Sequence, residues 1–343
     1  MQNEIRETAP LLDADGKLTH RGFSKKMLLK YDRRAIGANG LRIKEWDYYI
    51  VANGDFAVAL TIADNSYMGL HSVSLLDFKK PWEQTTSVMT FMPNGKTNLP
   101  STSKSGDTVF KNDKIDISFC TANGKRHLRC RMEKFKDKKP FECDLMLDDA
   151  GEESMVIATP FEKKETAFYY NQKINCMPAA GTARFDGKIY VFEKGSSFGT
   201  LDWGRGVWTY SNTWYWGSAS GIVEGERFGF NIGYGFGDTS AASENMLFYG
   251  GAAHKLEDVS FDIPMSGGHE DYMRTWTFSS SDGRFEMRFE PVLDRASCTS
   301  AILIKSDQHQ VFGRFSGKAV LDGGRVLEVK NLMGFAEKVM NKW

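Results

Sequence analysis

The chain has 343 residues, of which 41% are hydrophobic and 26% are charged, a composition typical of a folded globular protein. This length is too great for one ordinary hydrophobic core, so we expect about two domains. Lysine plus arginine and aspartate plus glutamate both total 44. This balance argues against a nucleic-acid or anionic-membrane partner, because either would require a basic excess.

The cysteines and the first residues of the chain bear on its compartment. The five cysteines are odd in number and widely separated, unlike an extracellular disulfide framework, and no pair has the C-x-x-C spacing of a zinc or redox site. The first residues carry acidic groups and lack the apolar segment of a secretion signal. No apolar run is long enough to span a membrane. We therefore expect a reduced, cytoplasmic protein without a transmembrane segment.

Turn dipeptides divide the chain into short segments. Glycine and asparagine tolerate the positive φ of tight turns, so Asn-Gly and Asp-Gly pairs between alternating segments predict β-hairpins. The turns begin at Asn39, Asn53, Asn94, Asn123, Asp186, Asp282 and Asp322.

The segments between these turns alternate as strands do. Residues 56–62, 115–119 and 285–289 place large apolar side chains at every second position. Helical periodicity is clearest at the C-terminus, where Asn331 is placed to cap a short helix running to residue 343. That helix would carry Phe335, Val339 and Trp343 on its apolar side. The sequence thus predicts an all-β fold of two antiparallel barrels or sandwiches, with a short C-terminal helix.

A change in composition marks the expected domain boundary. The first half is rich in lysine, whereas the chain becomes dense in Trp, Tyr, Phe and Gly after residues 177–181. We expect an N-terminal β domain over residues 1–178 and a C-terminal β domain over residues 179–343.

The aromatic segment 198–221 is the predicted site of ligand binding. Four of the eight tryptophans of the chain fall within it, and a strand would place Trp214, Trp216 and Ser218 on one face. The candidate residues of this segment are Asp202, Trp203, Arg205, Trp208, Tyr210, Trp214, Trp216 and Ser218.

The following strand, 227–236, alternates large apolar residues with small ones. Its small face combines three glycines with Arg227 and Asn231. Such a face leaves room for a ligand, or for the indoles of the preceding strand in a dry core. Both interpretations stay open, although Asn231 would need a polar partner if buried.

Asp202 and Arg205 flank Trp203-Gly204. Burial among aromatic rings would raise the pKa of Asp202 toward a range useful for acid catalysis, whereas a neighbouring arginine would lower it. The alternative is a structural Asp–Arg ion pair.

Further polar candidates follow the glycine-rich strand. Glu244 and His254 are candidates for proton transfer. Arg274 is expected on the same strand face as Tyr272 and Trp276, as a cation–π element or an anchor for an anionic group. The remaining candidates for ligand binding are Asp238, Asn245 and Trp276.

Several common chemistries lack their motifs. There is no Walker A loop, no H-E-x-x-H and no G-x-S-x-G, and the glycines of FGFNIGYGFG lie in an alternating strand rather than before a helix. The six histidines are too dispersed to predict a metal site. We expect neither a metal nor another cofactor.

Two resemblances arise at these residues. The strings FGTLDWGRGVW and WYWGSASG, with the closing FGRFSGKAVLDGGRVLEVKNLMGFAEKVMNKW, resemble the bacterial and protist proteins grouped as domain of unknown function 2804. More distantly, Gly181, Gly187, Lys188, Tyr190 and residues 202–204 are similar to an element of the AttH and carotenoid 1,2-hydratase group. That likeness implies two consecutive lipocalin-like, calycin-type barrels and an apolar or polyene-like ligand. The chain departs from the hydratases in lacking the histidine before the Trp-Gly pair.

The leading hypothesis is an enzyme that acts on a small, largely apolar or amphipathic molecule by acid–base chemistry, as a hydratase, isomerase or cyclase. Asp202 would be the acid, Arg205 would tune it, and Trp208, Trp214 and Trp216 would shape the cavity. The alternatives are a lipocalin-type binding protein without catalysis and a carbohydrate-active enzyme. The latter would pair Asp202 with Asp238 or Glu244 beside a tryptophan platform.

Overall fold

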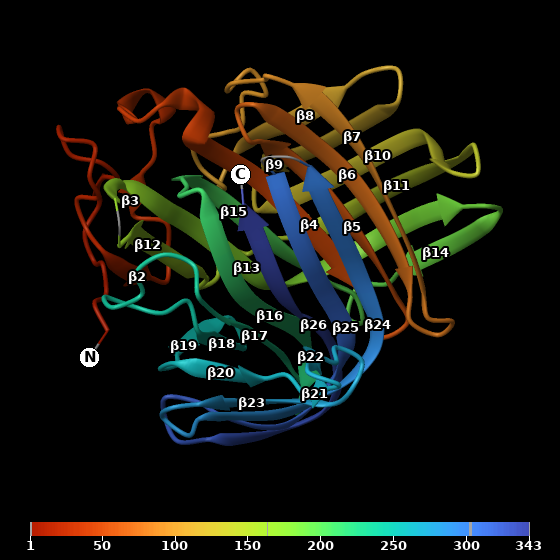
Figure 1. Ribbon diagram of the computed structural model, residues 1–343. Helices are drawn as coiled ribbons and strands as arrows, with labels where there is room; N and C mark the ends of the chain where they lie inside the picture. The colour runs from red at the N-terminus through yellow and green to blue at the C-terminus, as the bar shows by residue number, and fades with distance from the viewer. Residues whose placement is uncertain (1, 163, 302–303, 343) are drawn as a thin grey trace.

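Nearly all regular elements of the chain are antiparallel β-strands, arranged in two large curled sheets (Figure 1). The structure is a computed structural model that describes residues 2–162, 164–301 and 304–342. The predicted all-β class and the two consecutive lipocalin-like halves are confirmed. No helix in these ranges is long and apolar enough to cross a membrane.

The first sheet has thirteen strands, and most of it runs in the order β7-β6-β5-β4-β15-β13-β11-β10-β9-β8. Strands β12 and β14 pair with β13, and β2 pairs with β12. The strands are β2 (Gly22–Ser24), β4 (Ile43–Ala52), β5 (Phe56–Asp64), β6 (Met68–Asp77), β7 (Trp82–Phe91), β8 (Gly106–Lys111), β9 (Ile115–Ala122), β10 (Lys125–Lys136), β11 (Lys139–Asp148), β12 (Met155–Phe161), β13 (Lys164–Phe185), β14 (Lys188–Phe192) and β15 (Phe198–Val207).

The second sheet has nine strands in the order β19-β18-β17-β16-β26-β25-β24-β23-β20. They are β16 (Ser211–Val223), β17 (Glu226–Tyr234), β18 (Met246–Tyr249), β19 (Ala252–Lys255), β20 (Val259–Asp262), β23 (Trp276–Ser280), β24 (Phe285–Ala301), β25 (Ile304–Val320) and β26 (Val326–Lys342). The minor elements are the parallel pair β1 (Ala9–Pro10) and β3 (Leu29–Lys30), the hairpin β21 (Met265–Ser266) and β22 (His269–Glu270), and the 3-10 helices η1 (Arg33–Ala35) and η2 (Gly40–Arg42).

The predicted C-terminal helix is wrong. The chain from Val326 to Lys342 forms strand β26, which lies between β16 and β25. Phe335 and Val339 are four residues apart, a spacing that fits one face of a helix and equally one face of a strand. Asn331 does not cap a helix but lies within the strand with φ 53°. Trp343 lies outside the described residues.

The transition between the sheets falls after β15. Residue 178 lies in the interior of β13, and β14 and β15 still belong to the first sheet. The next strand, β16, starts the second sheet at Ser211. The domain boundary near residue 178 stays a prediction, and the strand pairing changes sheet between Val207 and Ser211.

The first barrel is packed on both sides where the second sheet covers it. Strand β15 is buried along its whole length, and β4 and β5 are buried at almost every position. A separate apolar layer fills this contact, with Tyr48 and Ile50 from β4 facing Phe312 and Phe335 from β25 and β26. Each strand in this contact region therefore has one face toward the interior of the first barrel and the other face toward the second sheet.

Candidate functional site

The predicted site is split by the alternation of β15. Asp202 faces the second sheet, where its Oδ1 lies 3.7 Å from Lys173 Nζ. Arg205 faces the interior of the first barrel, where its Nη1 donates to Asp47 Oδ1 at 3.0 Å. Residues three apart in a strand lie on opposite faces. The alternative interpretation, a structural ion pair between Asp202 and Arg205, is therefore wrong, and each residue has another partner.

Lys173 is the centre of the polar cluster between the sheets. Its ammonium lies 3.2 Å from Glu244 Oε2 and 3.7 Å from Asp202 Oδ1, and all three side chains are largely buried. It also donates to Tyr169 Oη at 3.1 Å. Asn171, on the same face of β13, donates from Nδ2 to Asp202 Oδ1 at 2.5 Å. These contacts join the β13–β15 part of the first sheet to the Glu244 segment of the second domain.

The charge state of Lys173 follows from two opposing effects. Burial lowers its pKa, but the facing carboxylates of Asp202 and Glu244 raise it by more, so the pKa lies above its ordinary value. The ammonium also lies 4.5 Å from the centre of the Trp216 ring. Lys173 is therefore a fixed positive charge in the cluster.

A row of residues crosses the second sheet opposite Lys173. Strand register places Arg295, Gln310, Glu337 and Trp216 side by side on β24, β25, β26 and β16. Glu337 Oε2 accepts from Gln310 Nε2 at 2.7 Å, and Gln310 Oε1 accepts from Arg295 at 2.5 Å. Glu337 Oε1 accepts from the indole of Trp214 at 3.0 Å. The row brings a third carboxyl group to the cluster.

The surroundings of Glu337 shift its ionisation. Burial raises its pKa to about 7, and the negative charge of Asp202 adds to the rise, against the lowering effect of the hydrogen bonds from Trp214 and Gln310 and of the Arg295 charge. Near neutral pH this side chain can therefore both hold and release a proton.

An aromatic cluster borders these polar groups, made of Trp46, Tyr169, Trp208, Trp214 and Phe236. The rings of Trp46 and Tyr169 are stacked at 6.1 Å, and Phe236 lies 4.7–5.3 Å from Tyr169, Trp208 and Trp214. Trp46 and Trp214 remain partly exposed, so solvent reaches this side of the site.

The Trp46 ring lies directly over the backbone of β15. A Cβ at Gly204 would come within 1.9 Å of that ring, so only glycine fits beneath it. The glycine of the Asp-Trp-Gly string therefore leaves the space that the Trp46 ring of the aromatic cluster occupies.

The segment between β17 and β18 carries two of these residues, Phe236 and Glu244. Backbone and side-chain bonds attach it to the N-terminal segment: Asn3 N donates to Ala241 O at 2.7 Å, and Ser243 N donates to Gln2 Oε1 at 2.8 Å. Residues from three separate parts of the chain thus fix Glu244 beside Lys173.

The glycine-rich face of β17 is occupied by protein side chains. Asn231 accepts the indole N–H of Trp216 at 2.7 Å and donates to Glu244 O at 2.8 Å, so its predicted need for polar partners is met. Cys176 Sγ packs on Gly229, and the Glu244 carboxylate packs on Gly233. Ser218, also a predicted ligand-binding residue, accepts from Asn175 at 2.8 Å.

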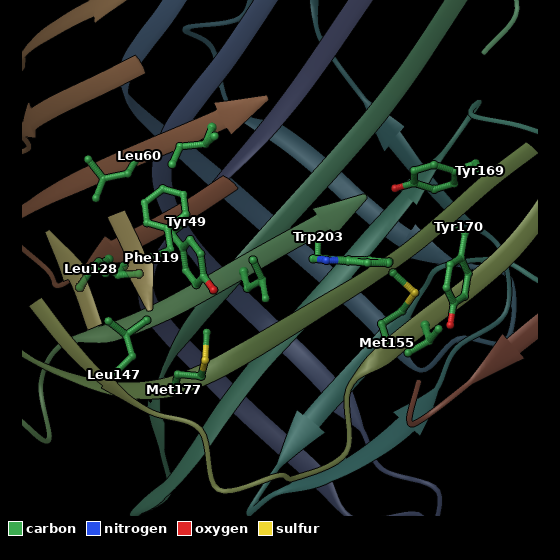
Figure 2. Packing of buried hydrophobic residues seen from close by; sticks show 14 of the residues in the cluster. Tyr49, Leu60, Phe119, Leu128, Leu147, Met155, Tyr169, Tyr170, Met177 and Trp203 are labelled. Atoms are coloured by element: carbon green, nitrogen blue, oxygen red, sulfur yellow. The ribbon is translucent and has the colours of Figure 1, made fainter. Parts of the chain in front are cut away.

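Trp203 and Trp208 lie on different sides of the first sheet. Trp203 packs edge-on against Tyr31 and Tyr170 in the core of the first barrel (Figure 2). Trp208 joins the aromatic cluster through Trp46, at 5.2 Å. Of the predicted tryptophans of segment 198–221, Trp208, Trp214 and Trp216 therefore lie at the polar cluster. Trp203 lies on the opposite side of the first sheet.

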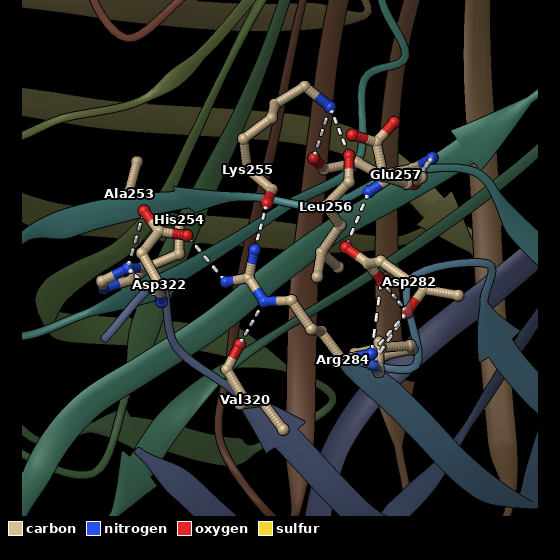
Figure 3. A network of polar contacts seen from close by, with 12 residues as sticks. Ala253, His254, Lys255, Leu256, Glu257, Asp282, Arg284, Val320 and Asp322 are labelled. Atoms are coloured by element: carbon tan, nitrogen blue, oxygen red, sulfur yellow. Dashed lines mark hydrogen bonds and ion pairs between the residues drawn. The ribbon is translucent and has the colours of Figure 1, made fainter. Parts of the chain in front are cut away.

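His254 belongs to another polar network, shown in Figure 3. Its Nδ1 lies 3.3 Å from Asp322 Oδ2, and Asp322 also accepts from Arg284 at 2.7 Å. Arg284 in turn donates to the backbone carbonyl of Lys255 at 2.8 Å. These bonds connect β19, the turn before β24 and the turn after β25.

The other predicted residues have structural surroundings. Asp238 accepts from Ser240 N in its own turn, and Asn245 accepts from Gly233 N and donates to Glu257 O. Trp276 is buried in the core of the second barrel, whereas Tyr210 is half exposed. Arg274 is exposed in a turn before β23, which begins at Trp276, so its expected place on that strand face is wrong.

Sequence reasoning missed Lys173, Tyr169 and Glu337. The signal for the first two is a polar face within an otherwise apolar strand: Tyr169, Asn171, Lys173 and Asn175 alternate along β13. Glu337 was hidden by the helical interpretation of residues 331–343. No group of three or more His, Cys, Asp or Glu side chains in the described ranges could hold a metal ion.

The chain was compared with solved structures, curated sequences and family models. The solved structures that are similar include kievitone hydratase from Nectria haematococca, at 12% identity over 88% of each chain with a TM-score of 0.50. They also include a candidate AttH from Nitrosomonas europaea, at 14% identity over 96% of this chain and 98% of that one with a TM-score of 0.54. At these identities they establish the shared tandem-barrel fold. No curated protein sequence matches. A family model described as "Domain of unknown function (DUF2804)" matches residues 2–343, and the chain belongs to that family.

Proposed function

We propose that the protein is a hydratase-like enzyme that adds water to, or removes it from, a small and largely apolar molecule bound between the two sheets. The aromatic cluster would hold the molecule, and the groups around Lys173 would move the protons. The two similarly folded proteins support this direction, since one of them is named for a hydration.

The observation that carries the proposal is the pairing of two unlike carboxyl groups. Asp202 accepts from Asn171 and faces the Lys173 ammonium, contacts that suit a carboxylate. Glu337, nearby on the second sheet, has its pKa raised to about 7. A carboxyl group that can hold a proton near neutral pH, close to a second carboxyl group that accepts hydrogen bonds, is the pattern of an acid and a base working together.

In the hydration direction, the Glu337 carboxyl transfers its proton to one carbon of a C=C bond. A water oxygen bonds to the other carbon and gives a proton to Asp202. The faces of Trp46 and Trp214 stabilise the positive charge that develops on the substrate. Proton exchange with solvent returns both carboxyl groups to their starting states, and dehydration follows the same steps in reverse.

Lys173 and Glu244 position the base. Lys173 lies between Glu244 and Asp202, so it fixes the distance from the second domain to the β15 carboxylate. A proton-transfer group must be held within hydrogen-bond reach of its substrate atom. Lys173 is therefore a positioning residue in this mechanism.

The test uses a panel of unsaturated ketones and isoprenoid alkenes incubated in isotope-labelled water, with mass spectrometry of the products. The full-length protein should add one labelled water to at least one compound. Asp202→Asn and Glu337→Gln should each lower turnover by about a hundredfold or more while the ligand still binds. Asp238→Asn, which alters a carboxylate bonded within its own turn, is the matched control and should retain activity.

Full turnover by Asp202→Asn or by Glu337→Gln contradicts the proposal. A ligand that co-purifies in native mass spectrometry but is never converted supports instead a binding protein without catalysis. One observation favours a binding protein without catalysis. The side chains of Lys173, Glu244 and Asn171 already bond to one another or to Asp202. The carbohydrate-active alternative stays a prediction; of its proposed partners for Asp202, Glu244 shares the Lys173 ammonium.

A further inference from the structure

A depression in the surface of the first sheet lies between two hairpin turns. One turn joins β10 to β11, and the other joins β13 to β14, the short strand labelled at the edge of the sheet in Figure 1. The depression has a volume of about 560 Å³, a size typical of sites for small molecules, and it is open to solvent. The wall includes Lys139, Glu142, Arg184, Asp186, Lys188 and Ile189.

The wall of the depression is held in place by packing and by a bond between the two turns. Phe185 contributes to the wall, and the rings of Trp82 and Phe135 pack on it at 6.0 and 5.2 Å. The next residue, Asp186, has φ 50°, the positive value of a tight two-residue hairpin turn. Lys139 Nζ donates to Asp186 Oδ1 at 2.6 Å and so joins the two turns. The depression is therefore formed before any ligand binds.

The carboxylates of the wall already have partners. Arg131 Nη1 donates to Glu142 Oε1 at 2.7 Å, and Asp186 accepts from Lys139. Neither carboxylate is therefore available to neutralise a further positive charge of the wall.

Arg184 is the cation of the wall that lacks a protein partner. Lys188 Nζ donates to Asp77 Oδ2 at 2.7 Å. The Arg184 side chain is exposed, and it forms no ion pair or side-chain hydrogen bond with any residue that the structure describes. Strand register places Ile189 directly beside it on the same face of the sheet, and Ile189 is 54% exposed. The wall thus combines an unpaired guanidinium with an apolar surface.

We propose that this depression is a binding site for a small monocarboxylate with an apolar body. A guanidinium can donate two parallel hydrogen bonds to a carboxylate, and the apolar body would cover Ile189. One unpaired positive charge matches a carboxylate better than a phosphate monoester, which carries about two negative charges near neutral pH. The site lies near the end of β13 that is remote from Lys173, and it does not depend on the proposed function.

The experiment follows the isoleucine methyl signals of the full-length protein by NMR, with carbon-13 in those methyl groups. Ile189→Val assigns the Ile189 signal by its loss. Hexanoate and its uncharged analogue hexanamide are titrated separately at constant ionic strength. Hexanoate should move the Ile189 signal saturably, whereas hexanamide should bind at least about tenfold more weakly. Ile232, buried in the second barrel, is the internal reference and should not move.

Arg184→Gln should weaken hexanoate binding by about tenfold or more, because it removes the charge-assisted hydrogen bonds. Arg184 is exposed, so this variant should keep its fold and the other isoleucine signals should stay in place. Arg288→Gln, at an exposed arginine of the second sheet, is the matched control and should bind hexanoate as the wild type does.

Four results would each overturn the proposal. Hexanoate produces no saturable movement of the Ile189 signal, or the Ile189 and Ile232 signals move together. Alternatively, hexanamide binds as tightly as hexanoate, or Arg184→Gln binds hexanoate with the affinity of the wild type.

Discussion

The two faces of β15 build opposite electrostatic environments. Toward the second sheet, the carboxyl groups of Asp202 and Glu244 face the Lys173 ammonium, and Glu337 lies nearby in the row that also holds Arg295. Toward the barrel interior, Arg205 is paired with Asp47. Burial raises the pKa of Glu337 to about 7, and the negative charge of Asp202 adds to the rise, so Glu337 can exchange protons near neutral pH. The Arg205–Asp47 pair instead fixes the barrel wall.

The largest expected effect concerns the Arg205–Asp47 ion pair in the interior of the first barrel. Arg205→Met removes the partner of Asp47 while retaining much of the buried volume. Breaking one half of a buried ion pair leaves an uncompensated charge, so the free energy of unfolding should fall by about 3–5 kcal/mol. Urea denaturation measures the change. Arg325→Met, which breaks an exposed pair with Glu224, is the control and should leave the denaturation midpoint in place. A loss as small as that of the control would show that the barrel face is not organised by this pair.

The second prediction concerns how Glu337, on the side of β15 that faces the second sheet, makes stability depend on pH. The pKa of Glu337 rises from 4.5 to about 7 on folding, so between these values the unfolded state loses its proton while the folded state keeps it. Stability should therefore decrease as pH rises through this window, by about 3 kcal/mol, and stay level above it. Glu337→Gln should abolish this decrease. The measurement is urea denaturation at intervals across the window.

Glu290→Gln is the control for this prediction, because Glu290 is exposed on the second sheet. Its stability curve should keep the decrease. If Glu337→Gln keeps it too, another group is responsible and the asymmetry of β15 loses its main support.

The third effect is of similar size to the second but has the opposite sign, and it belongs to the barrel interior. His71 shares a row with Asp47 across β4, β5 and β6, is fully buried and stacks on Phe110. Burial lowers its pKa from 6.5 to about 4. As pH falls through this range the unfolded state gains a proton and the folded state does not, so stability decreases by up to about 3 kcal/mol.

His71→Phe should remove this acid-side loss, as judged by thermal unfolding at a series of pH values. His20→Phe, at an exposed histidine, should retain it. An unchanged acid-side loss in His71→Phe would mean that another group is responsible for it.

The strand alternation made the fold predictable. A period of two identifies both which segments are strands and which side chains share a face, and it placed Trp214, Trp216 and Ser218 correctly on one side of β16. It could not separate a helix from a strand at Phe335 and Val339, where a four-residue spacing fits both. Because of this error, Glu337 was not recognised as a candidate residue.

The polar cluster was harder to predict because its members meet only through long-range pairing. Lys173 contacts Asp202 on the neighbouring strand and Glu244 in a loop, and the charge of Glu337 acts on it from the facing sheet. Proximity in sequence suggested Asp202 with Arg205 instead, although the two side chains lie on opposite faces of the same strand. A local pattern cannot reveal which distant side chains neutralise a charge.

The position of β26 between β16 and β25 has a consequence for synthesis of the chain. Lys173 and Asp202 can take their places once β15 has joined the first sheet, whereas Glu337 arrives with a strand that emerges more than a hundred residues later. Until β26 inserts, β16 has an open edge of unpaired backbone groups next to Trp214 and Trp216. The proposed acid is therefore the last component to be installed, and an incompletely folded chain has the base without it.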